Sequence, residues 1–201
     1  MKRALTLIAA SAALSLAGTA MGQNLVLNGS LDTDATFWNN GGGGTVAHNT
    51  ANDNTGNGGG SLAVTVATAG TDNSSVSSNI DGSVQFNGFN TGAHPATLLI
   101  TAYVFVDTPL VEAPGISGGN GGASVALIDG AIDFTGVITP DADRVLDNAA
   151  FEEITAPVLT LQAGGRQYHT WLINRCASGT AYYDDISVVD GSTSVQDWDI
   201  Y

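Results

Sequence analysis

The chain has 201 residues and is strongly acidic, with 19 aspartates and glutamates against five lysines and arginines and a formal net charge of −14. Lys2 is the last lysine, so the sequence has no basic surface for nucleic acid or for an anionic membrane. A phosphate-binding P-loop and a Schiff-base site each require a lysine, and both are excluded for residues 3–201.

The first 22 residues have the order of a secretory signal peptide. Lys2 and Arg3 form a positive start, residues 4–17 are apolar, and small residues follow. The apolar stretch is too short to cross a bilayer about 30 Å thick as a helix. No cysteine lies near the cleavage region, so no lipid anchor is expected. We therefore predict a signal peptide at residues 1–22, a domain at residues 23–201, and a secreted or periplasmic protein without a membrane anchor.

Short apolar runs then alternate with segments rich in Gly, Asn, Ser and Thr. Several runs have apolar residues at every second position, which is typical of a strand with one buried face. In one run Leu62, Val64 and Val66 share a face. In another, Leu98, Ile100, Ala102, Val104 and Val106 share one face, and Leu99, Thr101, Tyr103 and Phe105 share the opposite one. The strands predicted in this way cover residues 24–27, 45–48, 61–68, 75–80, 97–107, 124–128, 157–162, 167–175 and 181–189.

Helix signals are rare. Only residues 141–153, between Pro140 and Pro157, predict a short helix. Many short strands joined by turn-rich loops predict an all-β fold, a two-sheet antiparallel β-sandwich of the jelly-roll type. Cys176 is the only cysteine, so an internal disulfide is excluded. It either pairs between chains or, as we favour, is a small core residue.

Both ends of the predicted domain carry short motifs. Residues 24–32 read NLVLNGSLD, with Trp38 soon after, and residues 179–188 read GTAYYDDISV. This pairing resembles the jelly-roll carbohydrate-binding modules of the galactose-binding-like superfamily. Their first strand tends to run into Asn-Gly-x-Phe-Glu, and their last tends to read aromatic-x-Asp-Asp-Val-Ser-Leu. Leu31 stands where that family favours Phe, and Asp32 where it favours Glu.

The resemblance implies a structural calcium ion as a cofactor. In such modules an acidic group near the first strand and an Asp of the last strand often bind calcium beside backbone carbonyls. Carried over by position, the ligands are Asp32 and one or both of Asp184 and Asp185, and such oxygen groups suit calcium. Asp184 shares the inward face of its strand with two apolar residues, where a carboxylate needs a partner. The alternative is two solvated acids at a strand end.

The predicted strand at residues 167–175 carries a candidate sugar platform. Its alternation places Gln167, His169, Trp171, Ile173 and Arg175 on one face. An aromatic ring between polar groups suits a sugar, which has apolar C–H faces and a rim of hydroxyls. We therefore identify Trp171 as the platform, with Gln167, His169 and Arg175 beside it and Tyr103 contributing from another strand. The alternative places Trp171 in the core, because a slip of one residue exchanges the faces. Trp38 is expected in the core.

No catalytic constellation is visible. Residues 115–119 read GISGG, which matches a nucleophile elbow in letters but lacks the strand before it and the helix after it. The three histidines lack metal-ligand spacing. The leading hypothesis is a secreted, non-catalytic, lectin-like protein that binds a polysaccharide or glycan. An extracellular structural or matrix protein on the same fold is the alternative, and a buried Trp171 would favour it. A small glycoside hydrolase would need two carboxylates about 5–9.5 Å apart.

Overall fold

The computed structural model describes residues 24–26, 28–40, 44–56, 58–66, 74–78, 97–111, 121–129, 135–160 and 168–191. The predicted signal peptide, Gln167 and the GISGG segment lie outside these residues. Within them the chain forms strands and one 3₁₀ turn, Asp141–Asp143. No helix in this part of the chain is long and apolar enough to span a membrane.

Five strands of the described chain form one sheet, which we call sheet A, in the order β1-β4-β10-β6-β7. Every neighbouring pair is antiparallel. The strands are β1 (Trp38–Asn40), β4 (Ser74–Ser78), β10 (Tyr168–Arg175), β6 (Gly122–Asp129) and β7 (Thr135–Ile138). The strand β10 therefore lies at the centre of this sheet.

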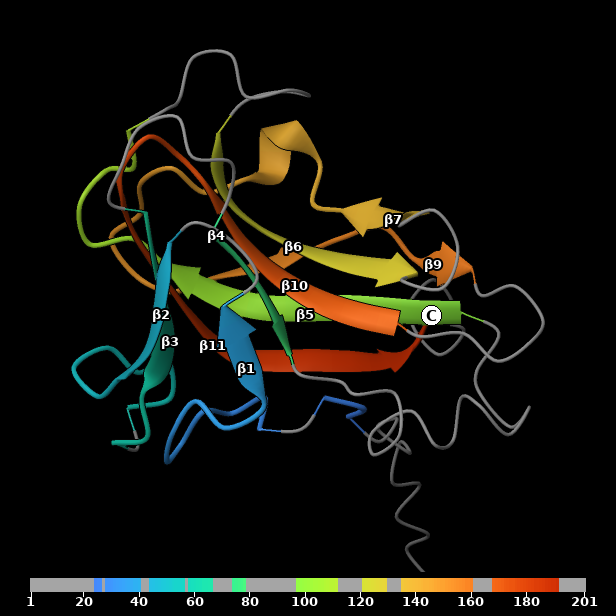
Figure 1. Cartoon of the computed structure of the whole chain (residues 1–201), viewed down its shortest axis with the longest axis horizontal. Coiled ribbons are helices and arrows are strands. Elements are labelled where there is room, and N and C mark those ends of the chain that lie inside the picture. The colour runs from blue at the N-terminus through green and yellow to red at the C-terminus, as the bar shows by residue number, and fades with distance from the viewer. Residues whose placement is uncertain are drawn as a thin grey trace, which may run out of the picture.

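The other strands of the described residues form sheet B, in the order β2-β3-β11-β5-β8 with β9 also paired to β5. They are β2 (Thr45–Asn49), β3 (Ser61–Val66), β11 (Gly179–Asp190), β5 (Thr97–Phe105), β8 (Glu152–Thr155) and β9 (Leu159–Thr160). These pairs are antiparallel too. Figure 1 shows β10 running beside β6, and β11 running beside β5. Two antiparallel sheets confirm the predicted β-sandwich.

The core lies between the sheets and follows the predicted alternation. One predicted face of each strand is buried: Leu62, Val64 and Val66 of β3, and Leu98, Ile100, Ala102 and Val104 of β5, with Val106 just after it. Leu172 of β10 and Val125 and Leu127 of β6 meet them from sheet A. Trp38 is also in this core, where its Nε1 donates to the Asn28 carbonyl at 3.1 Å. Cys176 is buried there as well, as predicted.

The predicted helix at residues 141–153 is wrong. Only the 3₁₀ turn Asp141–Asp143 forms, with Arg144 ion-paired to Asp141 at 2.6 Å. Val145 then exchanges backbone hydrogen bonds with Ala123 of β6, and the chain continues into β8. Tertiary strand pairing therefore outweighs the local helix preference of this segment. The short strands β1, β7 and β8 carry too few residues for their alternation to be recognised in the sequence.

A β-bulge interrupts β11. Asp184 lies opposite Tyr103 of β5, but Ser187 lies opposite Thr101, so β11 has one extra residue between these pairs. Asp185, inside the bulge, has a φ of 47°, a left-handed conformation that Asp tolerates better than most residues. The extra residue reverses the alternation, because a bulge shifts which face a side chain meets. Consequently Tyr183 and Asp184 are consecutive and both buried.

The motifs at the two chain ends lie side by side, as the resemblance implied. Leu25 N–H donates to the Val188 carbonyl of β11, and Ile186 N–H donates to the Gly29 carbonyl, both at 2.8 Å. The Asn24 side chain joins the same strand, donating to the Ile186 carbonyl and accepting from Val188 N–H. This pairing brings the Asn-Gly turn directly against the strand that carries Asp184 and Asp185.

Replacing Gly29 by alanine should lower the free energy of unfolding by about 1–3 kcal/mol, the usual cost of overpacking. A Cβ at this position would overlap the Ile186 carbonyl oxygen, so β11 or the turn must move. Urea denaturation measures the change, and Ser30→Ala at the exposed neighbouring position is the control, expected within about 0.5 kcal/mol of wild type. Equal midpoints for the two variants would show that the close approach is unimportant.

Candidate functional site

Trp171 lies on the outer face of sheet A. The register of β10 with β6 is continuous from Tyr168 to Arg175, so no slip occurs. Thr170, Leu172 and Asn174 point inward and are buried, whereas Trp171 is partly exposed on the other face. The interpretation in which Trp171 enters the core is therefore wrong, and the predicted division of faces is confirmed.

The polar neighbours predicted for Trp171 occupy the same face of β10. His169 and Arg175 are both partly exposed, while Ile173 between Trp171 and Arg175 is buried. On β6, the residue opposite Trp171 is Ala126, and the residue opposite Arg175 is Gly122. Ala126 is fully buried, and so is Ser124 of β6, which lies opposite Ile173, so this part of the outer face is covered. Trp171 is thus partly exposed on the central strand of sheet A.

Tyr103 does not join this face. It lies on β5 in sheet B, opposite Asp184 of β11 and Glu153 of β8. Its hydroxyl donates to Glu153 Oε2 at 3.2 Å, and this bond, with the charges of Glu153 and Asp185 and some desolvation, raises the pKa of Tyr103. The outer faces of the two sheets point away from each other, so Tyr103 and Trp171 cannot contact one sugar ring. The structure separates the predicted site into two.

The outer face of sheet B carries a row of aromatic rings that the sequence analysis did not identify. Tyr182 of β11 lies opposite Phe105 of β5, with ring centroids 6.0 Å apart and an interplanar angle of 27°. Phe151, just before β8, lies on the other side of Phe105 at 5.5 Å. All three side chains are partly exposed. The outward alternation of Tyr103 and Phe105 was a usable signal, but the partner strands were not predictable.

A pocket of about 380 Å³ opens beside this row and is called the Phe105 pocket. Phe105 lines it together with two segments, residues 51–54 and residues 149–151, which we call its walls. The first wall belongs to the loop between β2 and β3, and the second to the segment before β8. The pocket therefore combines aromatic rings with the side chains of Asn52, Asp53 and Asn54.

Asp53 and Asn54 hold the first wall in place. The carboxylate of Asp53 accepts backbone N–H bonds from Thr55, Gly56, Gly58 and Gly59, at 2.6–3.0 Å. Desolvation acts to raise the pKa of Asp53, but these bonds and that from the Thr55 hydroxyl outweigh it, so the pKa is lowered. Asn54 ties the loop to β11, because its N–H donates to Asp184 and its side chain to Asp185. The wall is thus built before any ligand binds.

The three predicted calcium ligands have different environments. Asp184 is 1% exposed and accepts backbone N–H bonds from Asp185 at 2.7 Å and Asn54 at 2.9 Å. Asp185 is partly exposed, and Asp32 is exposed. No group of three or more His, Cys, Asp or Glu residues in the described chain is arranged to hold a metal ion. Acidic side chains of the described residues therefore do not by themselves provide a set of calcium ligands. Among the three candidates, only the carboxylate of Asp184 is buried.

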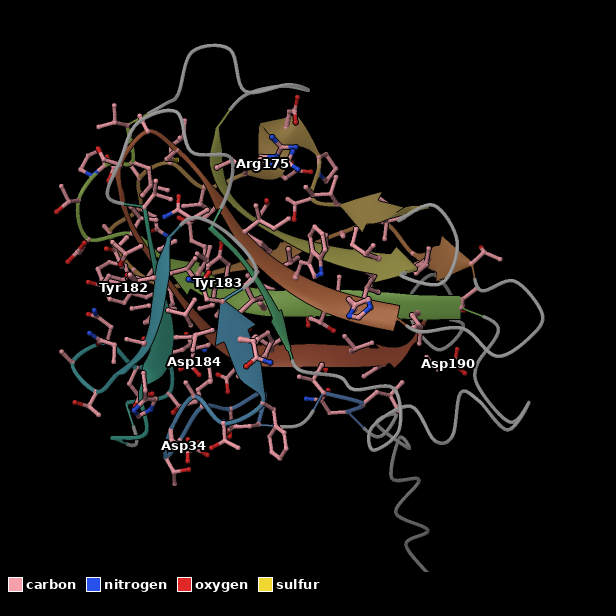
Figure 2. The ribbon with its side chains drawn as sticks, viewed as in Figure 1. Asp34, Arg175, Tyr182, Tyr183, Asp184 and Asp190 are labelled. Atoms are coloured by element: carbon pink, nitrogen blue, oxygen red, sulfur yellow. The ribbon has the colours of Figure 1, made fainter. Side chains whose placement is uncertain are left out.

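Asp184 nevertheless has the chemistry of a cation ligand. Burial raises its pKa to about 6, against the opposing hydrogen bonds from Asn54 and Asp185, and the charges of Asp185 and Asp53 raise it further. It forms no ion pair within the residues that the structure describes. A bound cation would supply the missing positive charge. Figure 2 shows Asp184 and Tyr182 on the same side of the molecule, well away from Arg175 and Asp190.

A scan against protein-family models finds no match, and a search of the curated proteins finds none either. Solved structures do match. A "Family 16 Carbohydrate Binding Module-2" is 17% identical with a TM-score of 0.52, over 83% of this chain and 99% of that one. The CBM22-1 xylan-binding domain of Paenibacillus barcinonensis Xyn10C is 15% identical with a TM-score of 0.54, over 84% and 94%. The chain therefore has the jelly-roll fold of carbohydrate-binding modules, as its end motifs predicted.

Proposed function

We propose that this is a secreted, non-catalytic protein that binds a polysaccharide through the outer face of sheet A. The observation that carries the proposal is the position of Trp171, partly exposed on the central strand β10. An indole ring stacks on the C–H face of a sugar, and His169 and Arg175 on the same face offer hydrogen bonds to hydroxyls. The fold shared with carbohydrate-binding modules supports this assignment without supplying the sugar.

Affinity electrophoresis tests the proposal. The protein, lacking residues 1–22, migrates through gels containing xylan, galactan, mannan, mixed-linkage glucan or polygalacturonate. We expect retardation by at least one polysaccharide, strongly reduced by Trp171→Ala and largely kept by Trp171→Phe, because a phenyl ring still stacks. Tyr103→Ala, on the outer face of sheet B, is the comparison. Thermal unfolding of each variant verifies that the fold is intact. Loss of retardation in Tyr103→Ala but not in Trp171→Ala would contradict the assignment to sheet A.

We further propose that a calcium ion binds at Asp184 and stabilises the fold without contacting the glycan. The buried Asp184 carboxylate supports this proposal. It lies in the strand that pairs with residues 24–29, and it has no ion-pair partner among the described residues. Calcium prefers carboxylate and carbonyl oxygens, and Asp184 lies where the bulge of β11 meets the loop between β2 and β3. Asp185 and Asp32 are the remaining candidate ligands.

A further inference from the structure

The Phe105 pocket lies on the opposite side of the sandwich from Trp171. Phe105 and Tyr182 belong to outward positions of β5 and β11 in sheet B, whereas Trp171 belongs to an outward position of β10 in sheet A. The buried core lies between the two faces. A sugar bound on one face therefore cannot reach the other face. Sugars bound on both faces at once must come from two different segments of polysaccharide.

We propose that the Phe105 pocket is a second sugar-binding site and that the protein cross-links polysaccharide chains through its two outer faces. The cross-linking part of this inference rests on the proposed function of Trp171. The site itself stands on its own geometry, because none of its residues lies on sheet A.

The chemistry of the pocket selects a sugar residue. The ring of Phe105, with Tyr182 at 6.0 Å and Phe151 at 5.5 Å, forms an aromatic row wide enough to meet the C–H face of a pyranose. Asn52 and Asn54 also line the pocket. The Asn54 amide already donates to Asp185, and its carbonyl oxygen can accept from a sugar hydroxyl. The volume of about 380 Å³ is at the small end of the range for ligand sites and suits one or two sugar rings.

The charge around the pocket selects a neutral sugar. Asp53 lines it, Asp107 accepts a bond from the Tyr182 hydroxyl at 3.4 Å, and Glu153 and Asp185 lie near Tyr103 on the same face. No lysine or arginine lines the pocket. A uronic acid or a sulfated sugar would place its negative charge against these carboxylates, whereas a neutral glycan meets no such repulsion.

Two features prepare the site for a ligand. Asp53 and Asn54 fix the first wall through backbone bonds and through contacts to β11, so little loop entropy is lost on binding. The bulge in β11 gives Tyr182 and Asp185 the same outward face, although an uninterrupted strand would place them on opposite faces.

The test measures binding and cross-linking separately with the same neutral polysaccharides, soluble xylan, galactan, mannan and mixed-linkage glucan. Light scattering follows cross-linking as protein is added, and affinity electrophoresis follows binding. The variants are Trp171→Ala, Phe105→Ala and their combination. Leu99→Ala is the matched control, because Leu99 is an outward, partly exposed apolar residue of the same strand that does not line the pocket. Polygalacturonate is the anionic comparison.

We expect the wild type and Leu99→Ala to raise the scattering of at least one neutral polysaccharide. Each single variant should abolish that rise, keep residual retardation, and weaken the apparent affinity by about tenfold or more, because binding at two sites gives avidity. The double variant should bind nothing, and polygalacturonate should not retard the wild type. A dimer with one site per chain would still cross-link after Phe105→Ala, so that variant separates the two explanations.

Three results would overturn the inference in distinguishable ways. If Phe105→Ala behaves like Leu99→Ala while Trp171→Ala loses binding, the second site is wrong and the proposed function stands. If Phe105→Ala loses all binding while Trp171→Ala is unchanged, sugar binding occurs only on sheet B, and cross-linking through two faces is wrong. A wild type that no polysaccharide retards would reject the proposed function and this inference together.

Discussion

Replacing Tyr183 by phenylalanine is expected to lower the free energy of unfolding by about 2–4 kcal/mol, because two buried backbone groups lose their partner. The Tyr183 hydroxyl crosses from sheet B to sheet A, where it donates to the Ile173 carbonyl at 2.6 Å and accepts from Ser124 N–H at 3.1 Å. Ile173 and Ser124 lie opposite each other on β10 and β6. The hydroxyl thus links the two sheets inside the core, and its burial raises the pKa of Tyr183.

Equilibrium urea denaturation of Tyr183→Phe measures this effect, and Tyr182→Phe is the matched control. The neighbouring Tyr182 hydroxyl bonds to the exposed Asp107 at 3.4 Å, so its removal should change stability by about 0.5 kcal/mol or less. Figure 2 shows Tyr182 near the edge of the molecule and Tyr183 nearer its middle. Similar losses in both variants would mean that the Tyr183 hydroxyl does not serve as the link between the sheets.

Without calcium, the stability contributed by Asp184 should decrease as the pH rises from about 4 to about 6. Burial raises the pKa of Asp184 in the folded protein from its ordinary value of 3.8 to about 6, so the folded state holds a proton that the unfolded state releases. That proton favours folding only while it remains bound. A difference of about two pKa units corresponds to about 3 kcal/mol. Below this range the trend reverses, because Asp34 and Asp53 have lowered pKa values and lose stabilising bonds on protonation.

Thermal unfolding in chelator between pH 4 and 7 measures this dependence. Asp184→Asn should remove the decrease, while Asp143→Asn, at an exposed position, should retain it. Calcium at pH 7 should raise the unfolding temperature of the wild type and of Asp143→Asn, and should leave Asp184→Asn unchanged. An identical calcium response in all three proteins would place any calcium site elsewhere, and an equal pH slope in all three would show that Asp184 is not the titrating group.

Much of the sandwich was predictable from the sequence, because alternation of apolar residues is a local property. Side chains of a strand alternate between its faces, so the composition of β5 alone defines its inward row from Leu98 to Val104. The same argument placed Asp184 inward, and this side chain is buried. It grouped Trp171 with His169 and Arg175 on one face of the strand, but it left open whether that face points outward. The end motifs also predicted the fold that the solved carbohydrate-binding modules share.

The neighbours of each strand were decided only by the tertiary structure. Phe105 and Phe151 are far apart in the sequence, and their contact depends on the pairing of β5 with β8, a strand too short to be recognised. The assignment of Tyr103 and Trp171 to different sheets likewise depends on strand order. The bulge at Asp185 arises where β11 must match β5, so no count along one strand could predict it. Sequence alone thus determined which way side chains face, because that depends on a single strand. The structure determined which side chains meet, because that depends on pairing between distant segments.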